Sequence, residues 1–306
     1  MSQRKDLVGT RPLTKADILH LLDRSDTYFQ DLLSTDPMPK RDLLAGRTVA
    51  NLFFENSTRT RTSFELAEKR LGAEAVSISM QTSSLSKGES LLDTIKVITA
   101  MKIDAVVVRH QSAGVPQLFQ KNLPSHIHII NGGDGAHEHP TQALLDAATM
   151  REMLGDLTGK KIVIVGDILH SRVARSNIYL LQKLGASVSV VGPTTLMPRH
   201  IEEVFGVPVS YKLDGAIGDA DAVIMLRIQL ERQSRAYLPS LSEFRTRYGL
   251  TSARLNETNA YVLHPGPMNR GVELDDESAD SEKSLILRQV KRGVAIRMAV
   301  LEWIFS

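Results

Sequence analysis

The stretch TVANLFFENSTRTRTSFE, residues 48–65, joins a mainly apolar run to a polar segment with the pattern of a helix start. The apolar run stops at Phe54, and hydroxyl side chains interleaved with Arg59 and Arg61 follow it. Hydroxyls that only cap a helix need no guanidinium groups beside them. Amides at a helix N-terminus present unpaired donors and about half a positive charge, so the stretch predicts a strand, a turn and an anion-binding helix start.

Short apolar strands alternate with helical patterns along most of the chain. The predicted strands cover residues 48–54, 105–108, 127–130, 161–165, 187–191, 222–226 and 261–263. Helical patterns include one that starts after Thr14, one over residues 140–154 and one over about 282–304, whereas residues 249–259 have a loop-like composition. Continuous apolar strands are typical of parallel sheets covered on both faces. The sequence therefore predicts an α/β fold of two domains, each a doubly wound parallel sheet flanked by helices.

Composition limits the class of protein. A chain of 306 residues is long enough for two domains with large cores. Its 37 basic and 35 acidic residues nearly balance, which gives no reason to expect a nucleic-acid partner. The absence of cysteine excludes disulfides, thiolate metal sites and a cysteine nucleophile. No apolar run approaches the ~20 residues of a membrane span, and the start lacks a signal-peptide core, so we expect a cytoplasmic protein without membrane contact.

Polar residues follow most of the predicted strands, at the edge where parallel sheets bind ligands. Arginine, histidine, glycine, amide and hydroxyl groups dominate there, and few lone carboxylates occur. The residues concerned are Ser57, Thr58, Arg59, Thr60, Arg109, His139, Arg172, Arg227, Gln229 and Gly266. This clustering favours a site for polyanionic ligands.

Two other patterns carry less weight. His126 and His128 share one face of a strand, but two histidines without a third ligand make a weak zinc site. The segment GDILHSR, residues 166–172, follows a strand but lacks the repeated glycines of a dinucleotide-binding loop. We therefore predict neither a metal nor a cofactor.

Five motifs together resemble those of the transcarbamoylase family. They are STRTR at residues 57–61, SLSKGE at 84–89, HPTQ at 139–142, RIQLER at 227–232 and HPGPMNR at 264–270. The first would fit the whole family, whereas RIQLER and HPGPMNR are similar to its aspartate branch. The resemblance covers essentially the whole chain.

This resemblance implies a role for each matching residue. Ser57, Thr58, Arg59 and Thr60 would hold the phosphate of carbamoyl phosphate. Arg109 would bridge the phosphate and the carbamoyl oxygen, His139 and Thr60 would reach the carbamoyl carbonyl, and Gln142 would hold its amide. The backbone of Gly266 and Pro267 would face the carbamoyl group; many relatives have leucine at Gly266, so this contact must rest on the backbone. Arg172, Arg227, Gln229 and Lys87 would bind aspartate.

The resemblance also implies an assembly. Ser84 and Lys87 would enter the site from a neighbouring subunit, which requires a homotrimer with shared active sites; Ser83 is the alternative to Ser84. Residues 1–138 with the C-terminal helix 286–306 would form the carbamoyl-phosphate-binding domain, and residues 139–285 the aspartate-binding domain, with the active site between them. A higher assembly with regulatory chains or a dihydroorotase is a further expectation that one sequence leaves open.

The implied reaction is carbamoyl transfer to L-aspartate, a step of pyrimidine biosynthesis. Transfer to ornithine is the nearest enzymatic alternative, but that branch carries a cysteine near its second substrate and this chain has none. The alternative from another class is a catalytically silent transcarbamoylase-like scaffold for another pyrimidine-pathway enzyme. Such a chain would be expected to lose some of the residues named above, and this one keeps them.

Overall fold

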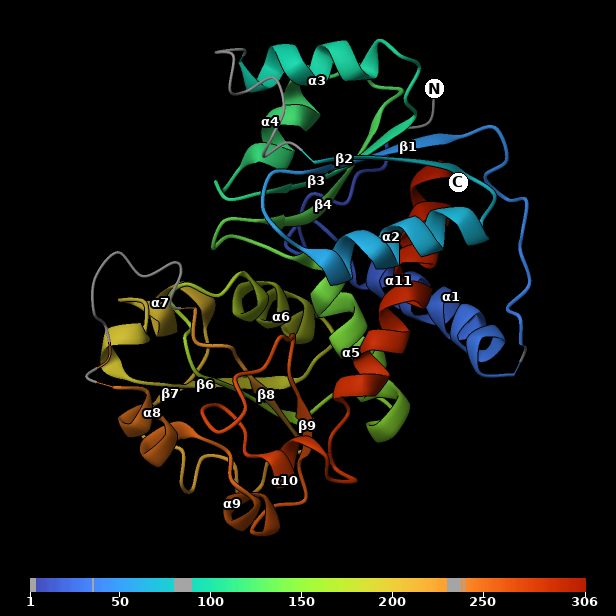
Figure 1. The fold of residues 1–306 in the computed structure, drawn as a ribbon. Helices are drawn as coiled ribbons and strands as arrows, with labels where there is room; N and C mark the ends of the chain where they lie inside the picture. Colours follow the sequence, from blue (N-terminus) through green and yellow to red (C-terminus); the bar gives the residue numbers. More distant parts are fainter. Residues whose placement is uncertain (1–3, 35, 80–89, 230–237, 239) are drawn as a thin grey trace. The chain divides into compact units, whose positions relative to one another are not determined.

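Residues 48–65 form the predicted strand, turn and helix. Strand β1 spans Thr48–Phe53 and helix α2 spans Thr58–Arg70. The computed structural model describes residues 4–34, 36–79, 90–229, 238 and 240–306 (Figure 1).

The chain divides into two compact units, each built on one parallel sheet. Met1–Leu144 and Lys291–Ser306 form the first unit, and Leu145–Val290 form the second. The predicted fold class, two α/β domains with parallel sheets, is therefore confirmed. The predicted domain limits lie at the starts of helices α5 (Pro140–Leu154) and α11 (Ile286–Phe305), a few residues before the points where the units divide.

The first unit holds a sheet of four parallel strands in the order β2-β1-β3-β4. Strand β2 spans Glu74–Ser79, β3 Ala105–His110 and β4 His128–Asp134. Strand β2 was not predicted from the sequence. It is an edge strand that pairs with β1 alone, and most of its described side chains are partly or fully exposed, so it lacks the continuous apolar run of its neighbours.

Helices cover both faces of this sheet. They are α1 (Lys15–Ser34), α2, α3 (Leu91–Thr99), α4 (Val115–Asn122) and most of α11. Helices α3 and α4 lie on one face, where Ile95 and Phe119 pack on Leu52 and Val108 of the strands. Helices α1, α2 and α11 lie on the other face (Figure 1). Alternation along β1 therefore points Asn51 towards α2.

The second unit holds five parallel strands in the order β7-β6-β5-β8-β9. They are β5 (Lys161–Val165), β6 (Ser187–Val191), β7 (Val209–Ser210), β8 (Ala222–Met225) and β9 (Tyr261–Leu263). Three of the four predicted strands of this half match these bounds residue for residue. The two-residue strand β7 was missed because it is too short to show a pattern.

Helices of the second unit complete its layers. Besides α5 from Leu145 on and the start of α11, they are α6 (Arg172–Lys183), the 3₁₀ turn η3 (Thr194–Leu196), α7 (Ile201–Phe205), α8 (Leu241–Tyr248), α9 (Ser252–Asn256) and α10 (Asp276–Ala279). Phe244 of α8 and Leu255 of α9 share a buried cluster with Val163 and Met225 of the sheet.

Two sequence expectations about this unit were wrong. Residues 249–259 were expected to be a loop, but Thr251 caps α9 by accepting a hydrogen bond from the amide of Arg254 at 3.4 Å. The helical pattern predicted a last helix from about residue 282, whereas the resemblance implied one from residue 286; α11 begins at Ile286. The residues before it pair with β9 instead: the amide of Val262 donates to the carbonyl of Lys283, and the amide of Leu285 donates to the carbonyl of Val262.

Candidate active site

The N-terminus of α2 is not capped by its own side chains. Ser57 occupies the N-cap position, yet its hydroxyl accepts no hydrogen bond from the first turn, and that turn holds no acidic residue. Ser57 is half-buried, whereas Thr58 and Arg59 are exposed. Helix amides, hydroxyls and a guanidinium are thus presented together, which is the donor set that binds phosphate groups.

Thr60, Arg109 and His139 come together in the first unit. Thr60 and His139 follow β1 and β4, and Arg109 lies near the end of β3. These strands are neighbours in the sheet, so their carboxyl ends lie at the same edge. Arg109 Nη1 lies 3.5 Å from Thr60 Oγ1, 3.5 Å from His139 Nε2 and 3.1 Å from the carbonyl of Gly132, to which it donates. Thr60 and His139 are buried. Three groups that can donate to a single oxygen therefore meet at this point.

Glu55 is a member of this cluster that sequence reasoning missed. Its Oε1 forms an ion pair with Arg109 Nε at 2.8 Å, and both side chains are largely buried. The sequence feature that could have pointed to Glu55 is its position, as a single carboxylate between the end of the strand and the hydroxyl residues.

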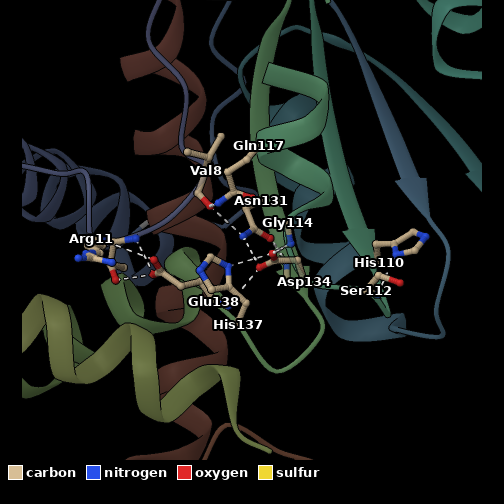
Figure 2. Close-up of polar contacts among 12 residues, drawn as sticks. Val8, Arg11, His110, Ser112, Gly114, Gln117, Asn131, Asp134, His137 and Glu138 are labelled. Carbon is tan, nitrogen blue, oxygen red and sulfur yellow. Dashed lines mark hydrogen bonds and ion pairs between the residues drawn. The ribbon is translucent and has the colours of Figure 1, made fainter. Parts of the chain in front are cut away.

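A buried polar network shapes the turn that presents His139 (Figure 2). Asn131 Nδ2 donates to Asp134 Oδ1 at 2.8 Å, and the same oxygen accepts from the amide of Glu138 at 3.1 Å. Asp134 Oδ2 accepts from the amide of Gly114 at 2.7 Å. The network ties the β4–α5 turn to the start of α4.

Glu138 anchors the same turn to the N-terminal segment. Its Oε2 accepts hydrogen bonds from the amide and the hydroxyl of Thr10, both at 2.6 Å. A Cβ atom at Gly9 would lie 2.4 Å from Glu138 Oε1, so a larger residue there would have to displace that carboxylate from its present position. Sequence reasoning missed this residue, although it stands directly before His139.

His110 follows Arg109 on β3 and is held in the neutral form. Its Nδ1 accepts from the amide of Ser112 at 2.8 Å (Figure 2). Burial lowers the pKa of His110.

Gln142 lies in the first turn of α5 and is also buried. Its backbone N–H donates to the carbonyl of His139 at 3.0 Å. This bond fixes His139 and Gln142 relative to each other, and both residues belong to the first unit.

The second unit brings its candidate residues to one edge in the same way. Arg172 follows β5 as the first residue of α6, and it is buried; Arg227 and Gln229 follow β8 and are half-buried. Ser171 caps α6 by accepting from the amide of Ala174 at 3.1 Å. Gly266 follows β9 with φ 61°, which favours glycine at this position.

Glu273 joins two of these loops, and sequence reasoning missed it. Its Oε1 accepts from the amide of Ile228 at 2.8 Å, between Arg227 and Gln229 in the chain. Its Oε2 accepts from the backbone N–H of Asn269 at 2.7 Å, in the HPGPMNR motif. The carboxylate is buried, and burial raises its pKa.

Some predictions have no counterpart among these contacts. Ser84 and Lys87, and the alternative Ser83, lie outside the described residues. Arg61 forms a long ion pair with Glu65, at 3.9 Å, along α2.

His128, one of the two histidines considered for a zinc site, makes contacts within the fold. His128 Nδ1 lies 2.8 Å from the carbonyl of Lys5, and its ring meets Phe305 edge-on. Across the described ranges of the chain, no three His, Asp or Glu side chains are grouped to hold a metal. None of the helices described here is long and apolar enough to cross a membrane.

Comparison with known proteins accounts for both units. Residues 5–152 match the model of the carbamoyl-phosphate-binding domain of aspartate/ornithine carbamoyltransferases, and residues 158–304 match the model of their aspartate/ornithine-binding domain. The aspartate carbamoyltransferase catalytic subunit of Gemmatimonas aurantiaca is 52% identical over 299 residues, which cover 97% of this chain and 92% of that protein. The corresponding subunit of Acidiphilium cryptum is 52% identical over 301 residues, which cover 97% and 95%.

Solved structures agree with the sequence matches. Aspartate transcarbamoylase of Trypanosoma cruzi, in complex with N-(phosphonacetyl)-L-aspartic acid, is 31% identical with a TM-score of 0.85, over 98% of this chain and 95% of that one. The catalytic subunit from M. jannaschii is 33% identical with a TM-score of 0.84, over 98% of both chains. On its sequence, its fold and the arrangement of its strand-end residues, the chain belongs to the aspartate/ornithine carbamoyltransferase family.

Proposed function

We propose a division of labour between the two units for the reaction that the chain catalyses. That reaction is transfer of the carbamoyl group of carbamoyl phosphate to the amine of L-aspartate, which gives N-carbamoyl-L-aspartate and phosphate. One observation carries the assignment of residues: Arg109 Nη1 lies within 3.5 Å of both Thr60 Oγ1 and His139 Nε2.

The phosphate of carbamoyl phosphate binds at the start of α2. Ser57, Thr58, Arg59 and Thr60 supply hydroxyl and guanidinium donors, and the uncapped amides add the helix dipole. The phosphate brings about two negative charges at neutral pH. Arg59 and Arg109 supply two positive charges to balance them.

The carbamoyl group binds beside Arg109. Attack of the aspartate amine on the carbamoyl carbon forms a tetrahedral intermediate whose oxygen becomes negative. Phosphate then leaves as the C–O bond breaks, and it takes up the proton that the amine nitrogen loses. Arg109, His139 and Thr60 donate to that oxygen; one well-placed donor is worth roughly 3–4 kcal/mol in the transition state. Gln142 holds the carbamoyl amide, and the backbone of Gly266 and Pro267 faces the same group.

Aspartate binds to the second unit. Arg172, Arg227 and Gln229 follow two adjacent parallel strands, β5 and β8, so they lie at one edge of that sheet. The two arginines match the two carboxylates of the substrate, which is the pairing that planar guanidinium groups favour. Ornithine ends in a cation instead, so these residues favour aspartate.

Ser84 and Lys87 complete the site from a neighbouring subunit of a homotrimer. Lys87 adds a fifth positive charge to Arg59, Arg109, Arg172 and Arg227, against two substrates that together bring about four negative charges. A cytoplasmic location and a higher assembly with regulatory chains or a dihydroorotase stay predictions.

The test is carbamoyl transfer by the purified chain with L-aspartate or L-ornithine as acceptor. Arg227→Ala removes a guanidinium that pairs with a carboxylate, so kcat/KM for aspartate falls by about 10- to 100-fold or more. Arg247→Ala is the matched control, because Arg247 is an exposed arginine of the same unit, paired with Glu243 at 3.1 Å.

Three outcomes separate the alternatives. Turnover with aspartate that is lost in Arg227→Ala and kept in Arg247→Ala supports the proposal. Turnover with ornithine would reassign the second substrate. A trimer that turns over neither acceptor would support the catalytically silent scaffold.

A further inference from the structure

A carboxyl–amide pair lies buried between β1 and α2, apart from the residues assigned to the substrates. Asn51 of β1 donates from Nδ2 to Glu68 Oε2 of α2 at 2.7 Å. Both side chains are fully buried, with 0% exposure. We refer to these two residues as the Asn51–Glu68 pair.

The Asn51–Glu68 pair is incomplete if Glu68 is ionised. Asn51 Oδ1 and Glu68 Oε1 have no hydrogen-bond partner among the residues that the structure describes. Both atoms can only accept when the carboxylate is charged, and a buried acceptor without a donor is costly. A proton on Glu68 Oε1 would turn that atom into a donor, and Asn51 Oδ1 is the acceptor of the pair that still lacks a donor. If that proton is shared with Asn51 Oδ1, the pair forms a closed ring of two hydrogen bonds.

The surroundings disfavour a charged carboxylate. Burial raises the pKa of Glu68 from its ordinary value of 4.5 to about 8, and Glu65 on the same helix adds to this, whereas the hydrogen bond from Asn51 and the charge of Lys69 oppose it. Helix α11 brings one cation, Arg297, against α2. Its guanidinium lies 5.1 Å from the ring centre of Phe64, and it is not among the charges that shift the pKa of Glu68.

No charged residue of the neighbouring strands lies directly opposite Asn51 in the sheet. Asn51 lies opposite Ser77 of β2 and Val107 of β3. Ser77 donates to Glu65 at 2.5 Å, so its hydroxyl is engaged with that carboxylate.

The pair stands at the base of the segment that presents the phosphate donors. It joins the middle of β1 to the last turns of α2, and the residues between them in the chain include Ser57 to Thr60. Fixing the strand and the helix to each other therefore fixes the direction in which the first turn of α2 points.

We propose that Glu68 is protonated in the folded chain at neutral pH and that the Asn51–Glu68 pair is a positioning device for the carbamoyl-phosphate half of the site. The protonation stands on the geometry of the pair itself. The positioning role rests on the proposed function of Ser57 to Thr60.

Infrared difference spectroscopy tests the protonation without reference to activity. A protonated carboxyl has its own C=O band, well separated from the carboxylate bands. We expect that band at about pH 7 in the wild-type chain and in Glu65→Gln, and a loss of intensity in Glu68→Gln. Glu65→Gln is the matched control because it removes a carboxylate one turn away and leaves the pair intact. Equal intensity in wild type and Glu68→Gln would overturn the proposal.

Kinetics test the positioning role. In Glu68→Gln the amide can donate to Asn51 Oδ1 and accept from Nδ2, so it reproduces the protonated pair at every pH. We expect its KM for carbamoyl phosphate to equal that of the wild type at about pH 7. Above about pH 8 the wild-type KM rises relative to that of Glu68→Gln, because ionisation breaks one bond of the pair. The ratio of the two KM values cancels the titration of the substrates.

The stability of the folded chain should also fall as pH rises and Glu68 ionises. A folded-state pKa above the unfolded value means that the stabilising contribution of Glu68 is complete below about pH 4.5 and is lost as pH rises to about 8. The folding equilibrium of the wild type should fall relative to that of Glu68→Gln by about tenfold per pH unit in this window, and level off above it. A flat comparison across the window would show an ionised Glu68 and contradict the proposal.

The two proposals can fail separately. A wild-type chain without carbamoyl transfer, yet with the Glu68-dependent band, would refute the proposed function and leave the protonated pair standing. Normal transfer with no Glu68-dependent band would do the reverse. A KM ratio that stays at one up to about pH 9.5 would refute the positioning role alone.

Discussion

At the scale of single residues, Arg109 of the proposed site is held in position by a carboxylate and a carbonyl. Arg109 meets Thr60 and His139 on one side, and pairs with Glu55 through Nε at 2.8 Å. An arginine held by several partners reaches its position before substrate arrives. Preorganised donors stabilise developing charge more effectively than donors that must first reorganise.

Arg109→Ala should therefore act mainly on kcat. Loss of an oxyanion donor lowers kcat by about 10²- to 10³-fold, because that contact strengthens in the transition state. Steady-state kinetics with both substrates varied measure the effect. Arg61→Ala is the control, since Arg61 is half-exposed and pairs only at 3.9 Å with Glu65, and it should change kcat by less than about twofold. A loss confined to KM would contradict the oxyanion role.

At the scale of elements, the loops after parallel strands are held by buried carboxylates from outside the motifs. Glu273 ties the loop after β8 to the loop after β9 through the amides of Ile228 and Asn269, and Glu138 ties the β4–α5 turn to Thr10. Backbone amides in such loops have no ladder partner, so a side-chain acceptor is needed to satisfy them. These carboxylates hold loops that carry residues of the proposed site: Glu138 stands directly before His139, whereas Glu273 lies outside the motifs.

Glu273→Gln should weaken aspartate binding. The variant replaces one acceptor oxygen by an NH₂ group that faces N–H donors, which costs about 1–3 kcal/mol. We expect KM for aspartate to rise by about tenfold, with a smaller change in KM for carbamoyl phosphate, because Ile228 lies between Arg227 and Gln229. Glu277→Gln, an exposed carboxylate in α10, should leave both constants unchanged. Equal rises in both KM values would argue for a general loss of structure instead.

At the scale of the whole molecule, the proposed site needs residues from two subunits. Arg59 and Arg109 belong to one chain, whereas Lys87 would reach the site from its neighbour. Ring-forming assemblies place the same surface of each chain against a different surface of the next, which permits such sharing.

Mixed assembly tests the sharing directly. Arg59→Ala and Lys87→Ala should each be inactive alone. When the two variants are dissociated and reassembled in equal amounts, about one quarter of the sites should regain activity. Half of the chains carry Arg59, and half of the neighbouring chains that complete their sites carry Lys87. Arg59→Ala mixed with Arg109→Ala is the control and should stay inactive, because both residues come from the same chain. No recovery in the first mixture would place Lys87 in its own chain's site or outside it.

The sequence by itself determined the α/β class, the two parallel sheets and the strand ends that carry Thr60, Arg109, His139, Arg172 and Arg227. It could do so because apolar runs and strand-end polar residues are local patterns, and parallel strands bring their carboxyl ends to one edge. Only the tertiary structure decided the partners of these residues. Glu55, Glu138 and Glu273 look like ordinary surface carboxylates in the sequence, and their roles come from contacts between distant segments. The same holds for Asn51 and Glu68: burial between β1 and α2 alone makes a proton, rather than a charge, the form of Glu68 that the fold favours.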